Sequence, residues 1–334
     1  MGAMRYIIVG AGGVGGTIGA RLFQGGHEVV LVARGDHLDA LQAGGLRLAT
    51  PEGETTLRIP AVGRPDEVGL RADDVVLLAV KTQDTEGVLN QWAWQPVGGG
   101  AVAAESVPVV CAQNSVANER LALRRFRYVY GMCVQLPATH LEPGHVQAQG
   151  APLSGLLHVG RYPSGADDTV TRIGADLARS RFLAPVTGDV MRWKYRKLLS
   201  NLGNAIEAVC GSSRTDGAAD LRRRVTAEGV AVLAAAGIGY VSAEEAARVR
   251  GDQVQARPVN GSARGGGSSW QSLTRGTGSI EADFLNGEIV LLGREHGVPT
   301  PVNEVLQRLA NQAAQQGRAP GSASPGEILA LVGA

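Results

Sequence analysis

Cysteine is scarce in the sequence and widely spread. Cys111, Cys133 and Cys210 form no C-x-x-C pair and no spacing typical of metal ligands. We therefore expect neither a disulfide framework nor a bound metal. The simplest setting for such a chain is the reducing cytoplasm.

Long apolar runs and an excess of charge of one sign are absent as well. No apolar run approaches the roughly 20 residues that span a membrane, and the N-terminus lacks the basic region and cleavage site of a signal peptide. Lysine and arginine number 32 against 31 acidic residues, which gives a net charge of +1. Neither nucleic acid nor a membrane is therefore expected as a partner.

Glycine, by contrast, is abundant, and one glycine-rich stretch is the most informative part of the chain. The apolar run Arg5–Val9 predicts a strand, residues 17–23 a helix, and Glu28–Val32 a second strand. Between the first strand and the helix lies the motif G-x-G-x-x-G, formed by Gly10, Ala11, Gly12, Gly13, Val14 and Gly15.

The spacing of these glycines has a physical basis. Gly10 permits the tight turn, Gly12 lets the backbone approach a pyrophosphate, and Gly15 lets the helix pack on the strand. The N-terminus of the helix offers free N–H groups to the anion. The motif alone would be weak evidence, since a glycine-rich turn also occurs in other α/β proteins. With both strands and the helix in place, it predicts binding of a dinucleotide.

The end of the second strand indicates which dinucleotide. An NAD site usually has an acidic residue there, whereas this chain has Ala33-Arg34. The guanidinium of Arg34 can pair with a 2′-phosphate, which a carboxylate would repel. The residues therefore favour NADPH, and the alternative is an arginine that is only solvated at a strand end.

Two later strands also deliver polar residues at their carboxyl ends, where α/β sheets place ligands. Residues 73–80 predict a buried strand followed by Lys81. Residues 107–111 predict another, followed by Gln113 and Asn114. Lys81 can alternatively be an ordinary surface lysine.

Residues 189–209 predict a helix with an unusual polar stripe. Lys197, Asn201 and Asn204 fall at i, i+4 and i+7, on one face of an otherwise apolar helix. Asparagine is a poor helix former, which favours a polar pocket over a solvated face. A second long helix is predicted for residues 279–296, with Glu281 in its first turn, where a carboxylate is often only a partner of the helix dipole.

The order of the elements predicts the fold class. Strands and helices alternate up to Gly188, with hairpins predicted at residues 46–61 and 128–149, and nearly everything afterwards is helical. We expect an N-terminal α/β domain of the Rossmann type at residues 1–188. A helical C-terminal domain is expected at residues 189–334.

Taken in order, these residues resemble the ketopantoate reductases (2-dehydropantoate 2-reductases) over essentially the whole chain. The family pattern joins the glycine motif, an arginine after the second strand, a lysine and an asparagine after later strands, a K-x-x-x-N helix, an S-S-x and an E-x-D-x-x-N-G segment. The matches are Gly10, Gly12, Gly15, Arg34, Lys81, Asn114, Lys197 with Asn201, Ser268-Ser269, and Glu281-Ala282-Asp283-Phe284-Leu285-Asn286-Gly287. The family fold, a Rossmann domain plus a helical domain, agrees with the predicted boundary.

The resemblance implies a reaction, a reduction of a 2-oxo acid by NADPH, with 2-dehydropantoate as the leading substrate. It implies that Lys197 is the general acid, which neutralises the alkoxide that forms on the substrate oxygen. A lysine in water is already protonated at pH 7 and can therefore donate. Glu281 would hold a substrate hydroxyl or Lys197 itself.

The resemblance also implies binding roles. Asn114 would lie near the nicotinamide and the substrate, and Lys81 at the cofactor edge of the cleft. Asn201 and Ser269 would form hydrogen bonds with the substrate, and Asn204 is an additional amide on the face of the general acid. A homodimer through the helical domain is a further expectation from the family.

The departures from the family pattern fall on the substrate side. Gly266 lies three residues before Ser269, where the family commonly has a substrate-binding asparagine, and Thr215 lies where another is expected. The cofactor residues and the proton donor match better. A 2-oxo acid is therefore a firmer expectation than 2-dehydropantoate itself.

Three other functions compete with this interpretation. A β-hydroxyacid dehydrogenase also has a K-x-x-x-N helix, but it prefers methionine at Val14 and a serine-glycine-glycine loop that is missing after Val116. An opine dehydrogenase would need a histidine as proton donor on the face of Lys197, and none is present there. A non-enzymatic NADPH sensor is expected to lose the proton donor, whereas Lys197 and Glu281 are retained.

Overall fold

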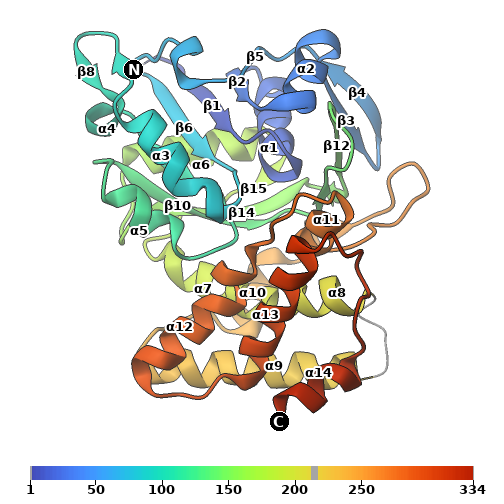
Figure 1. The fold of residues 1–334 in the computed structure, drawn as a ribbon. Helices are drawn as coiled ribbons and strands as arrows, with labels where there is room; N and C mark the ends of the chain where they lie inside the picture. Colours follow the sequence, from blue (N-terminus) through green and yellow to red (C-terminus); the bar gives the residue numbers. More distant parts are fainter. Residues whose placement is uncertain (1, 212–216, 334) are drawn as a thin grey trace. The chain divides into compact units, whose positions relative to one another are not determined.

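The computed structural model describes residues 2–211 and 217–333 and divides the chain into two compact units. Unit 1 consists of residues 1–194 and 242–264, and unit 2 of residues 195–241 and 265–334. Figure 1 shows the sheets of unit 1 and the helices of unit 2. The predicted fold class, a Rossmann-type α/β part followed by a helical part, is confirmed.

The core of unit 1 is an eight-stranded sheet. Its strands are β1 (Arg5–Val9), β2 (Glu28–Val32), β5 (Ala61–Val62), β6 (Asp74–Leu78), β9 (Val109–Cys111), β10 (Val129–Gln135), β14 (Gly155–Arg161) and β15 (Phe182–Leu183). They lie in the order β15-β14-β10-β9-β6-β1-β2-β5. Strands β1, β2, β6 and β9 are parallel, so their carboxyl ends meet at one edge of the sheet.

Helices cover both faces of this sheet. They are α1 (Gly13–Gln24), α2 (Gly35–Gly44), η1 (Pro65–Glu67), η2 (Thr82–Asp84), α3 (Thr85–Ala93), α4 (Ala103–Ser106), α5 (Asn118–Leu123) and α6 (Asp168–Arg179). Successive residues of β1 point to opposite faces. Tyr6 and Ile8 join the hydrophobic cluster that contains residues of α1 and α6, whereas Ile7 and Val9 join the one that contains residues of α3 and α5. Burial on both faces explains why the strand is continuously apolar rather than alternating.

Unit 1 also contains a separate sheet of four strands. It consists of β3 (Leu46–Thr50), β4 (Gly53–Leu57), β11 (Ala138–Thr139) and β12 (His145–Ala148), in the order β11-β12-β3-β4. The hairpin predicted for residues 46–61 is confirmed as β3 and β4. The hairpin predicted for residues 128–149 was too long, because β10 pairs with β9 and β14 and only β11 and β12 pair with each other.

The chain returns to unit 1 after it has entered unit 2. Residues 242–264 contain α10 (Ala243–Arg250) and β16 (Val254–Ala256), and β16 pairs antiparallel with β13 (Gly150–Pro152). A further small pair is β7 (Pro96–Val97) with β8 (Ala101–Val102). The two compact units divide after Lys194, and residues 242–264 belong again to unit 1. From the sequence, a single domain boundary is expected at Gly188.

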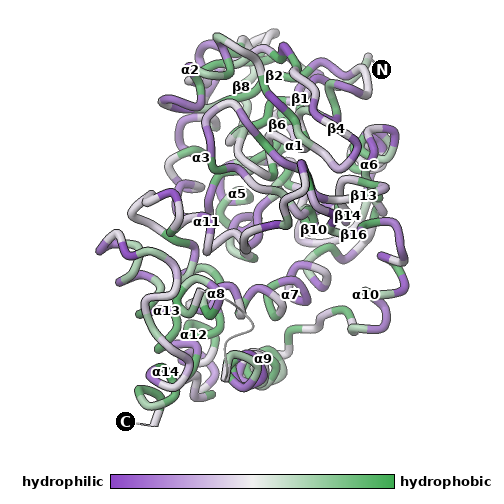
Figure 2. Tube along the Cα trace, turned by 90° about the vertical axis from the view of Figure 1, so that its right-hand side faces the viewer, coloured by the Kyte–Doolittle hydropathy of each residue, from purple (hydrophilic) through white to green (hydrophobic). Residues whose placement is uncertain are grey.

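Unit 2 is helical. It contains the end of α7 (Val190–Asn201), α8 (Asn204–Cys210), α9 (Ala218–Ala235), α11 (Ser268–Thr274), η3 (Glu281–Phe284), α12 (Asn286–His296), α13 (Pro301–Gln315) and α14 (Pro325–Val332). Buried leucines and valines of α9 and α13 pack against α8 and α12, and hydrophilic residues remain on their outer sides (Figure 2). Within the described residues, no helix is both long and apolar enough to cross a membrane.

Both long helices predicted in this region are interrupted, which corrects the sequence interpretation. The helix predicted for residues 189–209 ends at Asn201 and resumes at Asn204, so Asn204 begins a separate helix. The helix predicted for residues 279–296 is a 3-10 turn, η3, followed by α12. Glu281 therefore lies in the 3-10 turn and not at the start of the long helix.

One histidine of unit 1 is buried without a hydrogen-bond partner among the described residues. The ring of His158 in β14 is 1% exposed and stacks on Trp193, with centroids 3.5 Å apart. Neither ring nitrogen has a hydrogen-bond partner within the described part of the chain. Burial disfavours the charged ring and lowers the pKa of His158 to about 4.

We expect acid to destabilise the protein through His158. In the unfolded chain His158 binds a proton below about pH 6.5, whereas in the folded chain it binds one only below about pH 4. The free energy of unfolding therefore decreases as the pH falls from 6.5 to about 4. The loss at pH 4.5 amounts to roughly 2–3 kcal/mol. Urea unfolding of the wild type and of His158→Phe at pH 7 and pH 4.5 measures it, because phenylalanine keeps the stacking and cannot titrate. Equal pH dependence of the two proteins would contradict the assignment.

Candidate active site

The glycine turn has the geometry that dinucleotide binding requires. Gly10 has φ of +97°, and a Cβ there would lie 2.8 Å from the backbone nitrogen of Val80. A Cβ at Gly15 would overlap the carbonyl oxygen of Gly10. Helix α1 begins at Gly13 with Gly12 as its N-cap and has no acidic residue in its first turn. Its N-terminal N–H groups are therefore available to an anion, with no carboxylate of the first turn to compete, which fits a pyrophosphate.

Arg34 lies where the sequence placed it, after β2. It is the N-cap residue of α2, its side chain is 79% exposed, and its guanidinium is 3.8 Å from the carboxylate of Asp84. Because this ion pair is long and exposed, it contributes little to stability, and Arg34 can leave Asp84 to bind a more strongly charged group. The residue before it is Ala33, whose side chain has no carboxylate that would repel a 2′-phosphate.

Lys81 and Asn114 follow β6 and β9 at the same edge of the sheet as the glycine turn. Lys81 is the N-cap residue of η2, and Asn114 lies between β9 and α5. The residues predicted to bind the cofactor thus all follow parallel strands of one sheet: Gly10, Ala11, Gly12, Gly13, Val14, Gly15, Arg34, Lys81 and Asn114.

A buried hydrogen-bond network joins the loops that carry Lys81 and Asn114. The amide of Gln113 donates to the carbonyl of Val80 at 3.1 Å and to the hydroxyl of Thr85 at 2.7 Å. The hydroxyl of Thr85 donates to Asn118 at 2.7 Å, and Asn118 donates to Thr82 at 3.3 Å. The sequence interpretation missed Thr85 and Asn118 in this role, because threonines and asparagines after strands are common and only the contact reveals the pairing.

In unit 2, Lys197 and Asn201 lie one turn apart on α7. Lys197 is half-buried, whereas Asn201 is buried and 7% exposed. Across the described chain, the amide nitrogen of Asn201 has no hydrogen-bond partner. A buried donor without a partner costs about 1–3 kcal/mol, so this nitrogen is suited to a ligand oxygen.

Asn204 and Ser269 are brought together by the packing of α11 on α8. The carboxylate of Glu207 in α8 accepts a hydrogen bond at 2.8 Å from the N–H of Gly267, the N-cap residue of α11. A Cβ at Gly267 would lie 3.5 Å from the side-chain oxygen of Asn204. Ser269, two residues later, is 3% exposed. The two predicted substrate-binding residues therefore belong to one packed corner of unit 2.

Glu281 is buried at the start of η3, and an asparagine anchors the segment that follows. Glu281 is 3% exposed. Asn286, the first residue of α12, donates to the carbonyl of Leu202 at 3.1 Å and to the side chain of Asn303 at 3.0 Å. The amide of Asn286 thus holds the start of α12 against the break between α7 and α8. The motif contained Asn286, but its role became visible only through these contacts.

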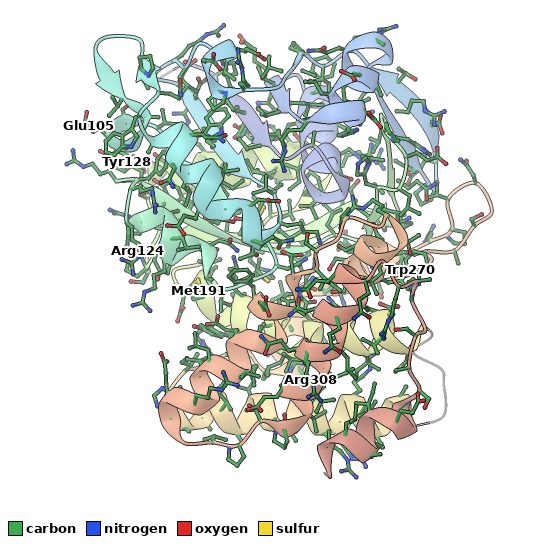
Figure 3. All side chains as sticks on the ribbon, in the orientation of Figure 1. Glu105, Arg124, Tyr128, Met191, Trp270 and Arg308 are labelled. Carbon is green, nitrogen blue, oxygen red and sulfur yellow. The ribbon has the colours of Figure 1, made fainter. Side chains whose placement is uncertain are left out.

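The structure explains the missing asparagine at position 266. A Cβ at Gly266 would lie 2.5 Å from Cγ of Trp270, and one at Gly265 would lie 3.0 Å from the far edge of the same indole. Trp270, labelled in Figure 3, therefore covers the two glycines from α11. Gln271 donates to the carbonyl of Gly266 at 3.3 Å. The other departure, Thr215, lies outside the described residues.

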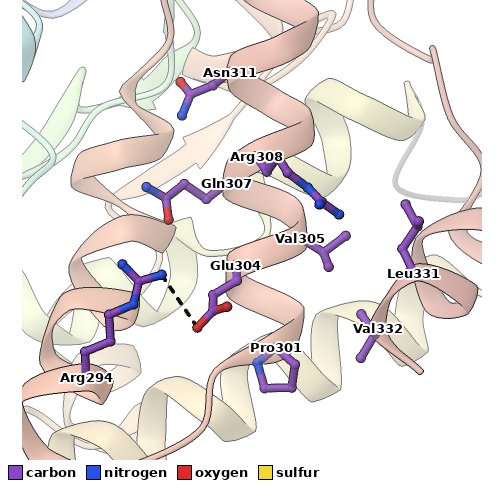
Figure 4. A pocket seen from close by; sticks show the side chains of 9 residues that line it. All are labelled: Arg294, Pro301, Glu304, Val305, Gln307, Arg308, Asn311, Leu331 and Val332. Carbon is purple, nitrogen blue, oxygen red and sulfur yellow. Dashed lines mark ion pairs between the residues drawn. The ribbon is translucent and has the colours of Figure 1, made fainter. Parts of the chain in front are cut away.

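Unit 2 also has a shallow hollow that contains none of the predicted site residues. Its volume is about 460 Å³, and it lies between α12, α13 and α14 (Figure 4). Arg294 and Glu304 form an ion pair of 3.9 Å at one side of it, and Leu331, which is 45% exposed, lies at the other. Most of its lining residues are exposed or half-buried, whereas the side chains of Asn201 and Glu281 are buried.

The sequence matches two models of protein families. Residues 6–164 match "Ketopantoate reductase PanE/ApbA", and residues 189–314 match "Ketopantoate reductase PanE/ApbA C terminal". The 2-dehydropantoate 2-reductase of Mesorhizobium japonicum is 30% identical, in an alignment that covers 94% of this chain and 99% of the relative.

Solved structures are similar over the same length. A PanE/ApbA family ketopantoate reductase from Ralstonia eutropha JMP134 has a TM-score of 0.75 at 28% identity, over 94% of this chain and 99% of that one. The ternary structure of D-mandelate dehydrogenase with NADH and anilino(oxo)acetate has a TM-score of 0.79 at 21% identity, with the same coverage. At that identity the second likeness establishes the fold alone.

Proposed function

Because the chain belongs to the ketopantoate reductase family, we propose that it reduces a 2-oxo acid to the 2-hydroxy acid with NADPH, with Lys197 as the general acid. The enzymes of this family are NADP-dependent oxidoreductases that act on CH–OH groups. The leading substrate is 2-dehydropantoate, the substrate named for the relative from Mesorhizobium japonicum.

The residues of unit 1 fit NADPH. The N-terminus of α1 and Gly12 receive the pyrophosphate, and the exposed guanidinium of Arg34 pairs with the 2′-phosphate. Lys81 and Asn114 extend this site along the sheet edge. When bound, NADPH supplies the hydride for the reduction.

One observation supports the substrate role of unit 2 most strongly, the buried amide nitrogen of Asn201, which has no hydrogen-bond partner in the described chain. It lies one helical turn after Lys197, so an oxygen that accepts from Asn201 lies near the ammonium. Lys197 then donates a proton to the oxygen on which charge develops. The hydroxyl of Ser269 and the amide of Asn204 add hydrogen bonds to the substrate, and Glu281 holds a substrate hydroxyl or the ammonium.

Gly266 and Trp270 influence which 2-oxo acid the protein accepts. Trp270 occupies the direction in which an amide at position 266 would point. One polar contact to the substrate is therefore replaced by an apolar ring, which favours 2-oxo acids with an apolar side chain more than the family pattern does. D-mandelate dehydrogenase, which is similar in fold, was solved with anilino(oxo)acetate.

The test is the oxidation of NADPH by the purified protein, followed by absorbance. We expect turnover with 2-dehydropantoate or with another branched 2-oxo acid from a panel, and a higher kcat/KM with NADPH than with NADH. Activity on 2-dehydropantoate means that Gly266 is tolerated in a ketopantoate reductase. Activity only on another oxo acid means that the pocket serves a different substrate. No oxidation with any oxo acid would overturn the proposed function.

We also propose that the protein is a homodimer through its helical part. Unit 2 exposes large apolar side chains, with Leu291 51% and Leu331 45% exposed. Gel filtration coupled to light scattering should give twice the chain mass of 34.6 kDa. A single-chain mass at micromolar concentration would contradict the dimer.

A further inference from the structure

The first turn of α7 packs directly on the large sheet of unit 1. Gly131 of β10 and Gly160 of β14 lie opposite each other in this pair of strands. A Cβ at Gly131 would lie 2.8 Å from Cγ1 of Val190, and a Cβ at Gly160 would lie 3.0 Å from the Cβ of Val190. Val190 is fully buried. The two glycines therefore leave the space that the first residue of α7 fills.

Two further residues of α7, Trp193 and Lys194, are buried in unit 1. The indole of Trp193 stacks on the ring of His158 in β14, with centroids 3.5 Å apart. The ammonium of Lys194 donates to Oε1 of Glu119 in α5, and the two side chains are 1% and 0% exposed. An apolar contact has no preferred direction, whereas a hydrogen-bonded ion pair depends on distance and angle. The ion pair is therefore the contact that best defines the rotation of α7 about its axis.

Helix α5, which supplies the carboxylate, is itself fixed to a loop of the proposed cofactor site. Asn118, the residue before Glu119, accepts a hydrogen bond from Thr85 at 2.7 Å and donates one to Thr82 at 3.3 Å. Thr82 directly follows Lys81. A shift of α5 relative to this loop would break both buried hydrogen bonds. The carboxylate thus belongs to a part of unit 1 that is held to the cofactor residues.

The residues proposed for the reaction lie on the same face of α7 as the buried lysine. Lys194, Lys197 and Asn201 are spaced i, i+3 and i+7, and α7 runs without interruption from Val190 to Asn201. Successive residues of an α-helix are turned by about 100°. A rotation of the helix that moved Lys194 away from its partner would therefore turn Lys197 and Asn201 by the same angle.

We propose that Lys194 and Glu119 are positioning residues for the general acid. Their buried ion pair sets the rotation of α7 and with it the direction in which Lys197 presents its ammonium. A buried ion pair is weak evidence for stability beyond that of apolar packing, and its best-attested use is to fix one register. Misplacement of a reacting group by about 1 Å can cost roughly 10²-fold in rate. The inference rests on the proposed function, because that function makes Lys197 the proton donor.

The experiment compares two double variants of the complete protein, each of which lacks one buried ion pair of unit 1. Glu119→Leu/Lys194→Met removes the positioning pair. Arg5→Met/Asp74→Leu removes a control pair, which joins the starts of β1 and β6 at 2.6 Å and is 7% and 0% exposed. Neither variant leaves an unpaired buried charge, so both should remain folded. Urea unfolding, kcat and the Kd for NADPH are measured for each protein.

We expect E119L/K194M to lower kcat by roughly tenfold or more and to leave the Kd for NADPH within about twofold of the wild type. R5M/D74L should keep the kcat of the wild type. If E119L/K194M does not fold, Glu119→Gln decides instead, because glutamine keeps the size of the side chain and removes its charge. It should lower kcat at an unchanged Kd for NADPH as well.

Two results would overturn this inference and leave the proposed function intact. One is a wild-type kcat in the folded variant of the Lys194–Glu119 pair. The other is an equal loss of kcat in both double variants, since the ion pair would then act only through the stability of unit 1. Absence of turnover by the wild type with every 2-oxo acid would overturn the proposed function and this inference with it.

Discussion

Replacing Lys197 by alanine is expected to lower kcat by roughly 10²–10³ and to leave the Kd for NADPH unchanged. The reason is that a positioned donor acts on the charge that develops in the transition state, and the removal of one such donor typically costs this much. The residues assigned to the cofactor follow the strands of unit 1 and are untouched by the substitution. Steady-state kinetics and calorimetric titration with NADPH measure the two quantities separately.

A neighbouring residue provides the matched control for this variant. Ser200 lies on the same helix and is exposed, so Ser200→Ala should change neither kcat nor Kd by more than about twofold. Lys197→Arg keeps the positive charge but presents a wider, planar group, and it should restore little activity. If K197A retained the turnover of the wild type, the proton would have to come from another group.

The largest expected effect on stability comes from Lys194, which forms a fully buried ion pair with Glu119. The side chains are 1% and 0% exposed, and the second carboxylate oxygen of Glu119 has no hydrogen-bond partner among the residues that the structure describes. Burial raises the pKa of Glu119, and the ammonium of Lys194 opposes this shift. Lys194→Met should leave an uncompensated buried carboxylate and lower the free energy of unfolding by about 3–5 kcal/mol.

Urea unfolding at neutral pH measures this loss, and two further variants identify its cause. In the double variant Lys194→Met/Glu119→Leu no charge is buried, and most of the stability should return. Arg71→Met removes one partner of an exposed pair, since Arg71 and Glu28 are 52% and 68% exposed at 2.9 Å, and should cost less than about 1 kcal/mol. If K194M loses no more unfolding free energy than R71M, burial does not increase the contribution of the Lys194–Glu119 pair to stability.

The parts of the fold that depend on local sequence could be predicted. The strand, glycine turn and helix from Arg5 to Gln24 follow from an apolar run, a required positive φ and small residues, all close in the chain. Asp167 and Ser242 cap α6 and α10 through their own side chains, which are of the types that local sequence favours at helix starts. Such features need no knowledge of distant residues.

The interruptions of the two long helices depend on distant residues and were missed. After Asn201, the backbone at Gly203 passes so close to Arg222 of α9 that a Cβ would overlap the guanidinium. The start of α12 is held by bonds from Asn286 to Leu202 and Asn303. Each contact joins residues far apart in the sequence, and neither has a local signal. Periodicity alone therefore extended both helices across these breaks.

For the candidate site too, positions that depend on local sequence could be predicted, whereas those that depend on distant contacts could not. Those after strands, such as Arg34 and Lys81, could be placed because parallel strands end at one edge of a sheet. The groups that support them could not, since His37, Thr85 and Asn118 look like ordinary polar residues until the bonds to Ala11, Gln113 and Thr82 are seen. The roles of Lys197, Asn201, Asn204, Ser269 and Glu281 remain predictions for the kinetic experiments.

The contact between Gly266 and Trp270 has a consequence for how this corner of the protein can change over evolutionary time. A side chain at position 266 would meet both Cβ and Cγ of Trp270, and Cβ is fixed by the backbone of α11. With Trp270 in place, a single substitution cannot introduce asparagine at position 266 unless the loop before α11 takes another path. A change at either of the two positions therefore restricts which residues the other can hold, and an amide at position 266 requires either the loss of the indole or a different path of the loop.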